Sequence, residues 1–169
     1  MSNLSPARFE TGRPMLLGGL RQRHEFSAAD RSIAEQWRQF RSRGEVAGRI
    51  GEHLFGVMCG VDSTGLEYMC GVEVESLANL PKGTGRMRVP AQWYAVFAHD
   101  GHATTLRSTW QQVFEWLSSS EYESAQTPDF ELYGPDANPL APVDGIEIWI
   151  GVAPSSHGDA QQTSTAGGE

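Results

Sequence analysis

Two short runs near the C-terminal end of the sequence each place a carboxylate beside an aromatic ring. Glu131 lies two residues before Tyr133, and Glu147 lies two residues before Trp149. Side chains two residues apart on a strand point to the same face of a sheet. Each run therefore presents a negative charge next to an aromatic wall, an arrangement suited to a cationic or flat aromatic ligand.

The last run indicates which of its faces should carry this chemistry. Ile146, Ile148 and Ile150 alternate with Glu147 and Trp149. Three isoleucines on one face indicate the core side, so we expect Glu147 and Trp149 on the opposite side. A plain solvent-exposed strand face is the competing interpretation, because most strand glutamates are solvated. The aromatic neighbours favour a binding face.

Other residues could extend the same surface. Glu67 and Met69 occupy matching positions in an earlier strand-like run. Glu131 alternates with Phe130, which we expect to face the core. Trp116 lies off the apolar stripe of a predicted helix, where it either lines the edge of a groove or is a partly buried tryptophan at the helix flank.

Metal binding and covalent catalysis find little support in the sequence. His99, Asp100 and His102 could supply ligands, but no third, distant partner accompanies them. Cys59 and Cys70 have no identifiable base partner, and we expect two buried thiols rather than a disulfide. The sequence has neither a Gly-x-Ser-x-Gly motif nor a glycine-rich phosphate loop. We therefore expect no metal and no cofactor.

The composition is that of a small acidic globular domain. The chain has 169 residues, of which 39% are hydrophobic and 20% charged, enough apolar content for one core. Its net charge of −8 argues against a surface that neutralises nucleic-acid phosphates. No stretch approaches the roughly 18 apolar residues that span a membrane, and the N-terminus lacks a signal-peptide core. We expect a cytoplasmic protein.

The elements that must position these residues follow one order twice. In the first half, Ile33, Trp37 and Phe40 recur at helical spacing after a short apolar strand and before a hairpin. In the second half, Leu106 and Trp110 begin a similar helix. The predicted strands cover residues 14–20, 53–61, 66–74, 87–98, 129–133 and 145–152, and the predicted helices end near residues 44 and 117.

The two halves also match in detail. Residues 65–69 align with 145–149, and both helices carry an apolar residue four positions before a tryptophan. A repeat of about 75 to 80 residues in two copies is too long for a solenoid. We predict an α+β fold, a pseudo-twofold duplication of a β-α-β-β unit with antiparallel sheets, two helices and a central ligand groove. The expected boundaries are a flexible N-terminus (1–10), a domain (11–153) with repeats 13–75 and 86–152, and a disordered tail (154–169).

A set of motifs in this order resembles the GyrI-like family, which includes the effector-binding domains of AraC-type and multidrug-responsive regulators. The likeness covers roughly residues 10–152. It rests on GVEV after Glu67-Tyr68, VPAQWYAVF, Thr109-Trp110 with EWL, DFELY and EIWI. Gly151 is a departure, because the family usually has proline after Ile-Trp-Ile.

The resemblance implies a groove at the pseudo-twofold axis that holds bulky cationic or aromatic molecules. By position it implicates Glu131, Tyr133, Glu147 and Trp149 as ligand contacts, with Tyr68 and Tyr94 as walls. Regulators of the family carry a helix-turn-helix module before this domain, and ten N-terminal residues are too few for one. We therefore expect a standalone form.

Three functional classes stay open at this point. The first is a binding module that senses or sequesters a small molecule. The second is a hydrolase that opens strained cyclopropane rings of DNA-alkylating compounds, with Glu147 as base and Tyr94 or Tyr68 assisting. The third is an interaction protein similar to acidic gyrase inhibitors, whose partner would be DNA gyrase or a separate regulator protein.

Overall fold

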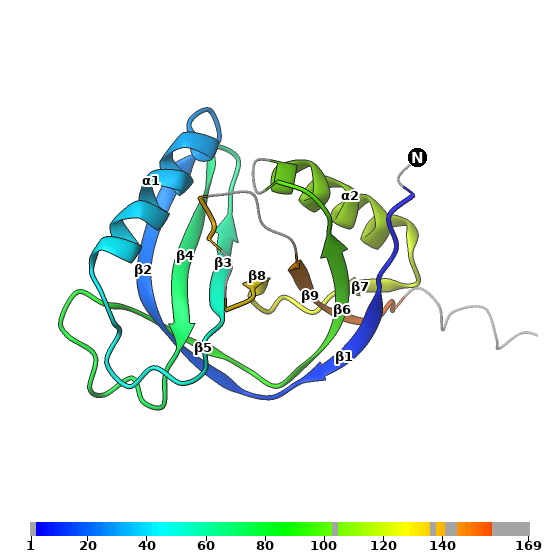
Figure 1. The fold of residues 1–169 in the computed structure, drawn as a ribbon. Coiled ribbons are helices and arrows are strands. Elements are labelled where there is room, and N and C mark those ends of the chain that lie inside the picture. The colour runs from blue at the N-terminus through cyan, green and yellow to red at the C-terminus, as the bar shows by residue number, and fades with distance from the viewer. Residues whose placement is uncertain (1–2, 103–104, 136–137, 141–144, 157–169) are drawn as a thin grey trace, which may run out of the picture.

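The computed structural model describes residues 3–102, 105–135, 138–140 and 145–156, and it confirms the predicted α+β class. Nine strands form one curved antiparallel sheet with two helices (Figure 1). The elements are β1 (Arg8–Gly12), β2 (Met15–Glu25), α1 (Ala29–Ser42), β3 (Leu54–Val61), β4 (Gly65–Glu73), β5 (Gly85–Val89), β6 (Gln92–His99), α2 (Leu106–Ser119), β7 (Tyr122–Ser124), β8 (Asp129–Tyr133) and β9 (Ile146–Pro154).

The strand order confirms the duplication. The sheet runs β1-β6-β9-β8-β3-β4-β2-β5, with β7 paired to β9. Its centre consists of β6-β9-β8 followed by β3-β4-β2, so the two β-α-β-β units meet where β8 pairs with β3. Each unit also ties its helix to the end of its first strand through a histidine. His24 Nδ1 lies 2.6 Å from Ser32 Oγ, and His99 Nδ1 lies 2.7 Å from Thr109 Oγ1.

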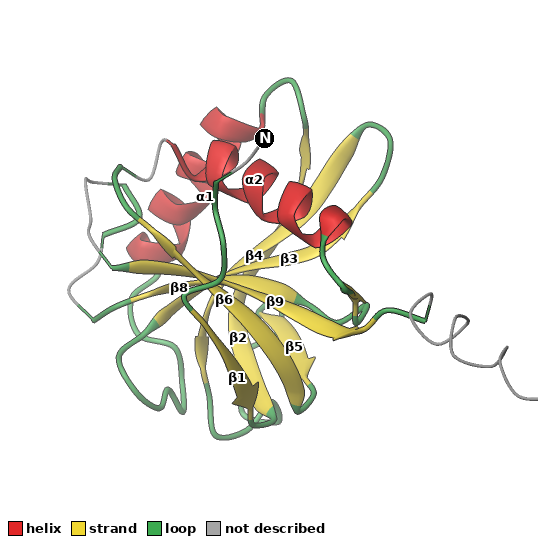
Figure 2. Ribbon diagram, turned by 90° about the vertical axis from the view of Figure 1, so that its right-hand side faces the viewer, coloured by secondary structure: helices red, strands yellow, loops and turns green. Residues whose placement is uncertain are grey.

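Both helices lie on the same face of the sheet, as Figure 2 shows. The tryptophan of each apolar stripe is buried, Trp37 to 2% exposure and Trp110 to 8%. They pack in one core with the isoleucines of β9 and with side chains of β2 and β4. The predicted helical stripes therefore mark the contact between helices and sheet.

The opposite face of the sheet has a core of its own. Leu17, Val57, Met69, Val96 and Phe130 come from five different strands, yet they form one buried cluster. Strands this far apart in the sheet order can share a cluster because the sheet curls strongly, and Figure 1 shows the arc. Both faces of the central strands are consequently buried.

Several boundaries differ from the prediction. The strand expected over residues 87–98 is two strands, because Pro90 has no N–H to donate and the chain changes partner there, from β2 to β9. The segment expected to be flexible, residues 1–10, overlaps β1, which pairs with β6 from Arg8 onward. Strand β7 was not predicted.

Ordered structure continues further toward the C-terminus than the sequence predicted. The polar tail was expected from residue 154, but Pro154 still belongs to β9 and Ser155 N–H donates to Glu121 O (2.9 Å). Residues 157–169 lie outside the described part of the chain. Cys59 and Cys70 are both free thiols; Cys70 is buried as expected, whereas Cys59 is only partly buried. Among the described residues, neither helix has the length and apolar character that crossing a bilayer requires.

One buried amide joins α1 to the sheet and gives a first prediction. Gln36 is fully buried, donates to the carbonyls of Leu20 and Tyr68 (both 2.9 Å) and accepts from His24. Replacing Gln36 by Leu leaves these three buried groups without their hydrogen-bond partner, so the free energy of unfolding should fall by about 2–4 kcal/mol in urea titrations. Gln39→Leu, on the exposed side of the same helix, should change it by less than about 1 kcal/mol. Equal effects would contradict this role.

Candidate functional site

A cavity of about 520 Å³ opens between the two helices. Its walls come from both repeats, so it lies at the junction that the duplication creates. A volume of this size is within the range of pockets for drug-sized ligands. It is lined chiefly by Phe26, Ile33, Trp37, Met58, Leu66, Tyr68, Leu106, Trp110, Glu131, Tyr133 and Leu140.

Glu131 of β8 places a carboxylate on this lining, and the residue is only 5% exposed. The Tyr68 hydroxyl donates to Oε1 at 2.6 Å and the Tyr133 hydroxyl donates to the same oxygen at 2.9 Å. The indole N–H of Trp110 donates to Oε2 at 2.8 Å. Three donors from β4, β8 and α2 therefore converge on one carboxylate.

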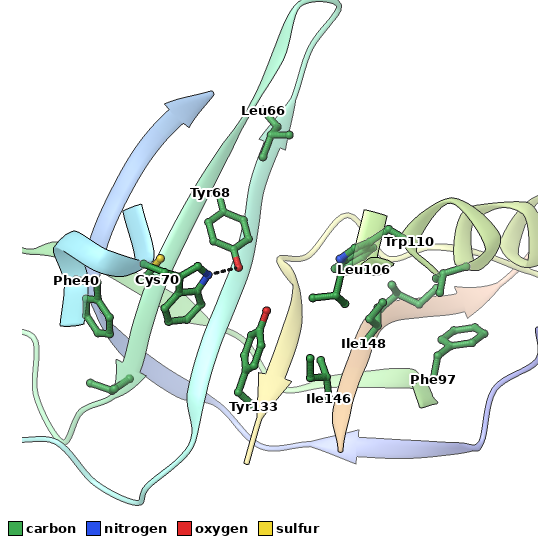
Figure 3. Packing of buried hydrophobic residues seen from close by; sticks show 14 of the residues in the cluster. Phe40, Leu66, Tyr68, Cys70, Phe97, Leu106, Trp110, Tyr133, Ile146 and Ile148 are labelled. Atoms are coloured by element: carbon green, nitrogen blue, oxygen red, sulfur yellow. Dashed lines mark hydrogen bonds between the residues drawn. The ribbon is translucent and has the colours of Figure 1, made fainter. Parts of the chain in front are cut away.

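Aromatic rings surround this carboxylate. Trp37 Nε1 donates to the Tyr68 hydroxyl at 3.2 Å, and the Trp37 and Tyr133 rings lie edge to face with centroids 5.4 Å apart. In Figure 3 the hydroxyls of Tyr68 and Tyr133 point toward one another, with Trp110 on the other side of the junction. The four rings form an aromatic cage with Glu131 on its floor.

The electrostatics of the cage favour a positive ligand. No lysine or arginine of the described residues forms an ion pair with Glu131, and the buried His99 acts on it only through its electrostatic field. Burial raises the pKa of Glu131, although the hydrogen bonds from Tyr68 and Trp110 oppose this shift. Burial also raises the pKa of Tyr68 well above its usual value, so its phenol stays protonated and donates.

Gly56 makes room for this arrangement. The pairing of β3 with β8 sets Gly56 directly opposite Glu131. A Cβ at this position would collide with the Tyr68 hydroxyl and the Glu131 carboxylate. Only glycine leaves the space in which these two groups meet.

An ion pair bridges the two helices at the cavity. Arg107 Nη1 of α2 lies 3.5 Å from Asp30 Oδ2 of α1, and both residues line the cavity with highly exposed side chains. Exposed pairs of this kind contribute little to stability. The pair can therefore separate at small cost when a bulky molecule enters.

The structure brings together three of the predicted site residues, Glu131, Tyr133 and Tyr68. It does not bring Glu147 and Trp149 to them. In the pairing of β8 with β9, Glu131 lies opposite Ile148, so the face with the isoleucines is also the face with the cavity. Glu147 and Trp149 therefore project from the other side of the sheet, together with Phe130.

Glu147 has an arginine partner on that far side. Arg8 donates to both of its oxygens, at 2.5 and 3.1 Å, and the Trp149 indole N–H donates at 3.3 Å. Burial would raise the pKa of Glu147, but the hydrogen bonds from Arg8 and Trp149 outweigh it, and the pKa is lowered. This carboxylate is already compensated within the protein.

The remaining predicted residues lie apart from the cage. Tyr94 is on the same far face as Glu147, but it pairs with Gly151 whereas Glu147 pairs with Ala98, about 13 Å away along the strands. The expected acid–base pair of Glu147 and Tyr94 does not form. Glu67 is partly exposed and accepts a hydrogen bond from Arg21 at 2.5 Å.

The two tryptophans Trp110 and Trp116 of α2 have different surroundings. Trp116 packs on Phe97 (5.2 Å between ring centroids) and Tyr122 (6.0 Å), away from the cavity lining. Trp110 is buried in the core with Trp37, and its indole N–H also donates to Glu131 on the cavity lining. No sequence signal distinguishes these uses, because a stripe position is equally compatible with core and cavity.

The described residues hold no group of three or more histidines, cysteines or acids that could bind a metal ion. His99 Nε2 lies 3.0 Å from the carbonyl of His102. Its other ring nitrogen bonds Thr109, as described above, so both nitrogens are used within the fold.

Comparisons with known proteins agree with this geometry. Residues 6–153 match the family model of the GyrI-like small molecule binding domain. The transcriptional regulator BrlR of Pseudomonas aeruginosa is 31% identical over 128 residues, 73% of this chain and 47% of BrlR, so the chain spans about half the length of that relative.

Solved structures show the same fold at lower identity. SAV2435 bound to tetraphenylphosphonium has a TM-score of 0.69 and 19% identity, over 86% of this chain and 93% of that one. An integron cassette protein from the mobile metagenome of Vibrio cholerae has a TM-score of 0.63 and 18% identity, over 89% and 99% of the two chains.

The geometry at Gly56 gives a second prediction. Gly56→Ala should lower the free energy of unfolding by about 1–3 kcal/mol, because the new methyl group forces Tyr68 and Glu131 apart. Gly60→Ala in the same strand is the matched control, since a Cβ there meets nothing within 4 Å. Urea unfolding of both variants tests this, and a Gly56→Ala protein as stable as Gly60→Ala would contradict it.

Proposed function

Because this chain belongs to the family of GyrI-like small molecule binding domains, we propose that its cavity binds a bulky aromatic cation, which the protein senses or sequesters. One observation carries this proposal. Glu131 is a buried carboxylate that has no lysine or arginine partner among the described residues, and it lies in a cage of four aromatic rings.

The aromatic cage leaves part of the charge of the Glu131 carboxylate uncompensated. A buried carboxylate is unfavourable unless hydrogen bonds or an opposite charge stabilise it. The three donors supply only part of this stabilisation, as the raised pKa of Glu131 indicates. A delocalised cation loses little hydration on burial and gains both Coulomb attraction and contact with aromatic faces.

The comparisons support the same class of ligand. SAV2435, which shares the fold, is bound to tetraphenylphosphonium, a phosphorus cation that carries four phenyl rings. BrlR is a transcriptional regulator, which supports a sensing role for the corresponding part of this chain. Tetraphenylphosphonium is therefore the natural first probe.

The third prediction tests the charge of Glu131. Glu131→Gln keeps the shape of the side chain and removes its charge, so the affinity for tetraphenylphosphonium should fall about tenfold or more, equivalent to about 1.4 kcal/mol. The affinity for triphenylphosphine oxide, a neutral aromatic probe, should change much less. Quenching of Trp37 and Trp110 fluorescence, with calorimetry as a second method, measures both affinities.

Glu147→Gln is the matched control, because it removes an equivalent charge from the far face of the sheet. It should leave the affinity for tetraphenylphosphonium unchanged. A larger loss for Glu147→Gln than for Glu131→Gln, with both variants folded by circular dichroism, would contradict the proposed site.

The fourth prediction concerns pH. A raised pKa means that Glu131 takes up its proton at a higher pH than an ordinary glutamate, with its usual value of 4.5. Affinity for the cation should therefore decrease on acidification already above pH 4.5, as the carboxylate is neutralised. The Glu131→Gln protein should lack this dependence. An identical pH profile in both proteins would exclude Glu131 as the titrating group.

A further inference from the structure

A second cavity, of about 390 Å³, lies on the other side of the sheet. Its lining comes from β1, β2, β3, β4, β6, β8 and β9 and from the segments before β2 and β3. Among the described residues, none lines both this cavity and the one between the helices. The sheet itself separates the two. We refer to it as the far-side cavity.

Aromatic rings form much of its lining. Phe130 stacks on Trp149 with centroids 5.6 Å apart and an interplanar angle of 18°. Tyr94 stands edge to face against both rings, at 5.5 and 5.4 Å, and Phe55 lies 5.5 Å from Phe130. Such a surface suits a planar apolar molecule.

Tyr94 adds a polar group that the protein leaves unused. The residue is 1% exposed, and its hydroxyl is buried with no hydrogen-bond partner among the described residues. Buried hydroxyls are nearly always bonded, so this one is available to a partner that enters the cavity. Burial raises the pKa of Tyr94 to about 12, and the phenol therefore keeps its proton and can donate it to an acceptor.

The carboxylates at the far-side cavity, unlike Glu131, form ion pairs with arginines. Glu10 accepts from Arg8 at 2.7 Å, and both oxygens of Glu73 accept from Arg13. Neither carboxylate is left to attract a cation. Arg8 is shared between Glu10 and Glu147 and Arg13 pairs with Glu73, so each of these carboxylates already has a guanidinium partner, which favours a neutral ligand over a cation.

We propose that the far-side cavity is a second small-molecule site, for a neutral planar aromatic that accepts a hydrogen bond from the Tyr94 hydroxyl. This goes beyond the proposed cation site, because the two cavities lie on opposite faces and select different charges. The hydrogen bond from Tyr94 orients the bound molecule, and the rings of Phe130 and Trp149 provide its apolar contact.

The fifth prediction uses two probes of similar shape, 2-methoxynaphthalene, which has an ether acceptor, and 2-ethylnaphthalene, which has none. Tyr94→Phe removes only the hydroxyl. It should lower the affinity for the methoxy probe about fivefold, the size of one neutral hydrogen bond, and leave that for the ethyl probe unchanged. Equilibrium dialysis measures the four affinities. Equal loss for both probes, or no loss for either, would overturn the proposal.

Amide chemical shifts locate the probes independently of any variant. On titration of the wild-type protein with 2-methoxynaphthalene, Gly12 and Gly51 should shift, because both line the far-side cavity. Shifts confined to Ala34 and its neighbours in α1, which line the other cavity, would overturn the proposal.

Cross-controls separate this proposal from the cation site. Tyr94→Phe should bind tetraphenylphosphonium with wild-type affinity, and Glu131→Gln should bind 2-methoxynaphthalene with wild-type affinity. Failure of tetraphenylphosphonium to bind would leave the naphthalene result unaffected. Competitive displacement of the methoxy probe by tetraphenylphosphonium would place both in one cavity and contradict a second site.

Discussion

The structure is organised around a negative charge that is held away from water. The Glu131 carboxylate remains buried because Tyr68, Tyr133 and Trp110 each donate a hydrogen bond to it from a different element. This requirement fixes the distance between the two repeats, since β4 belongs to one unit and α2 to the other. It also demands glycine at position 56, where any side chain would occupy the space of the donors.

Duplication explains where the cavity lies. Each helix is anchored to its own repeat, through His24 and Ser32 in one and His99 and Thr109 in the other. The junction of β3 and β8 therefore lies between the two helices, and the space above it becomes the cavity. The symmetry is broken at this junction, because Gly56 of β3 faces Glu131 of β8 across it.

The curl of the sheet gives its two faces different chemistry. The helix-side cavity has a carboxylate with no arginine or lysine partner among the described residues, whereas on the far side Glu10, Glu73 and Glu147 are each paired with an arginine. Strands β8 and β9 contribute to both faces through alternate residues. A change of register by one residue would move the charge of Glu131 to the far side, so strand pairing sets the selectivity of both cavities.

The sequence by itself determined the order of elements within the two β-α-β-β units and their duplication, because helical and strand periodicities depend on residues close together in the chain. Its motifs carried the family resemblance, but β1 and β7 were not predicted. The sequence also placed Glu131 beside Tyr133. Only the tertiary structure decided that Glu131 shares a face with Ile148 rather than with Glu147, and that Trp110 is a donor. Periodicity shows which residues of one strand share a face, but the register between strands is set by hydrogen bonds between distant segments, which a local pattern does not encode.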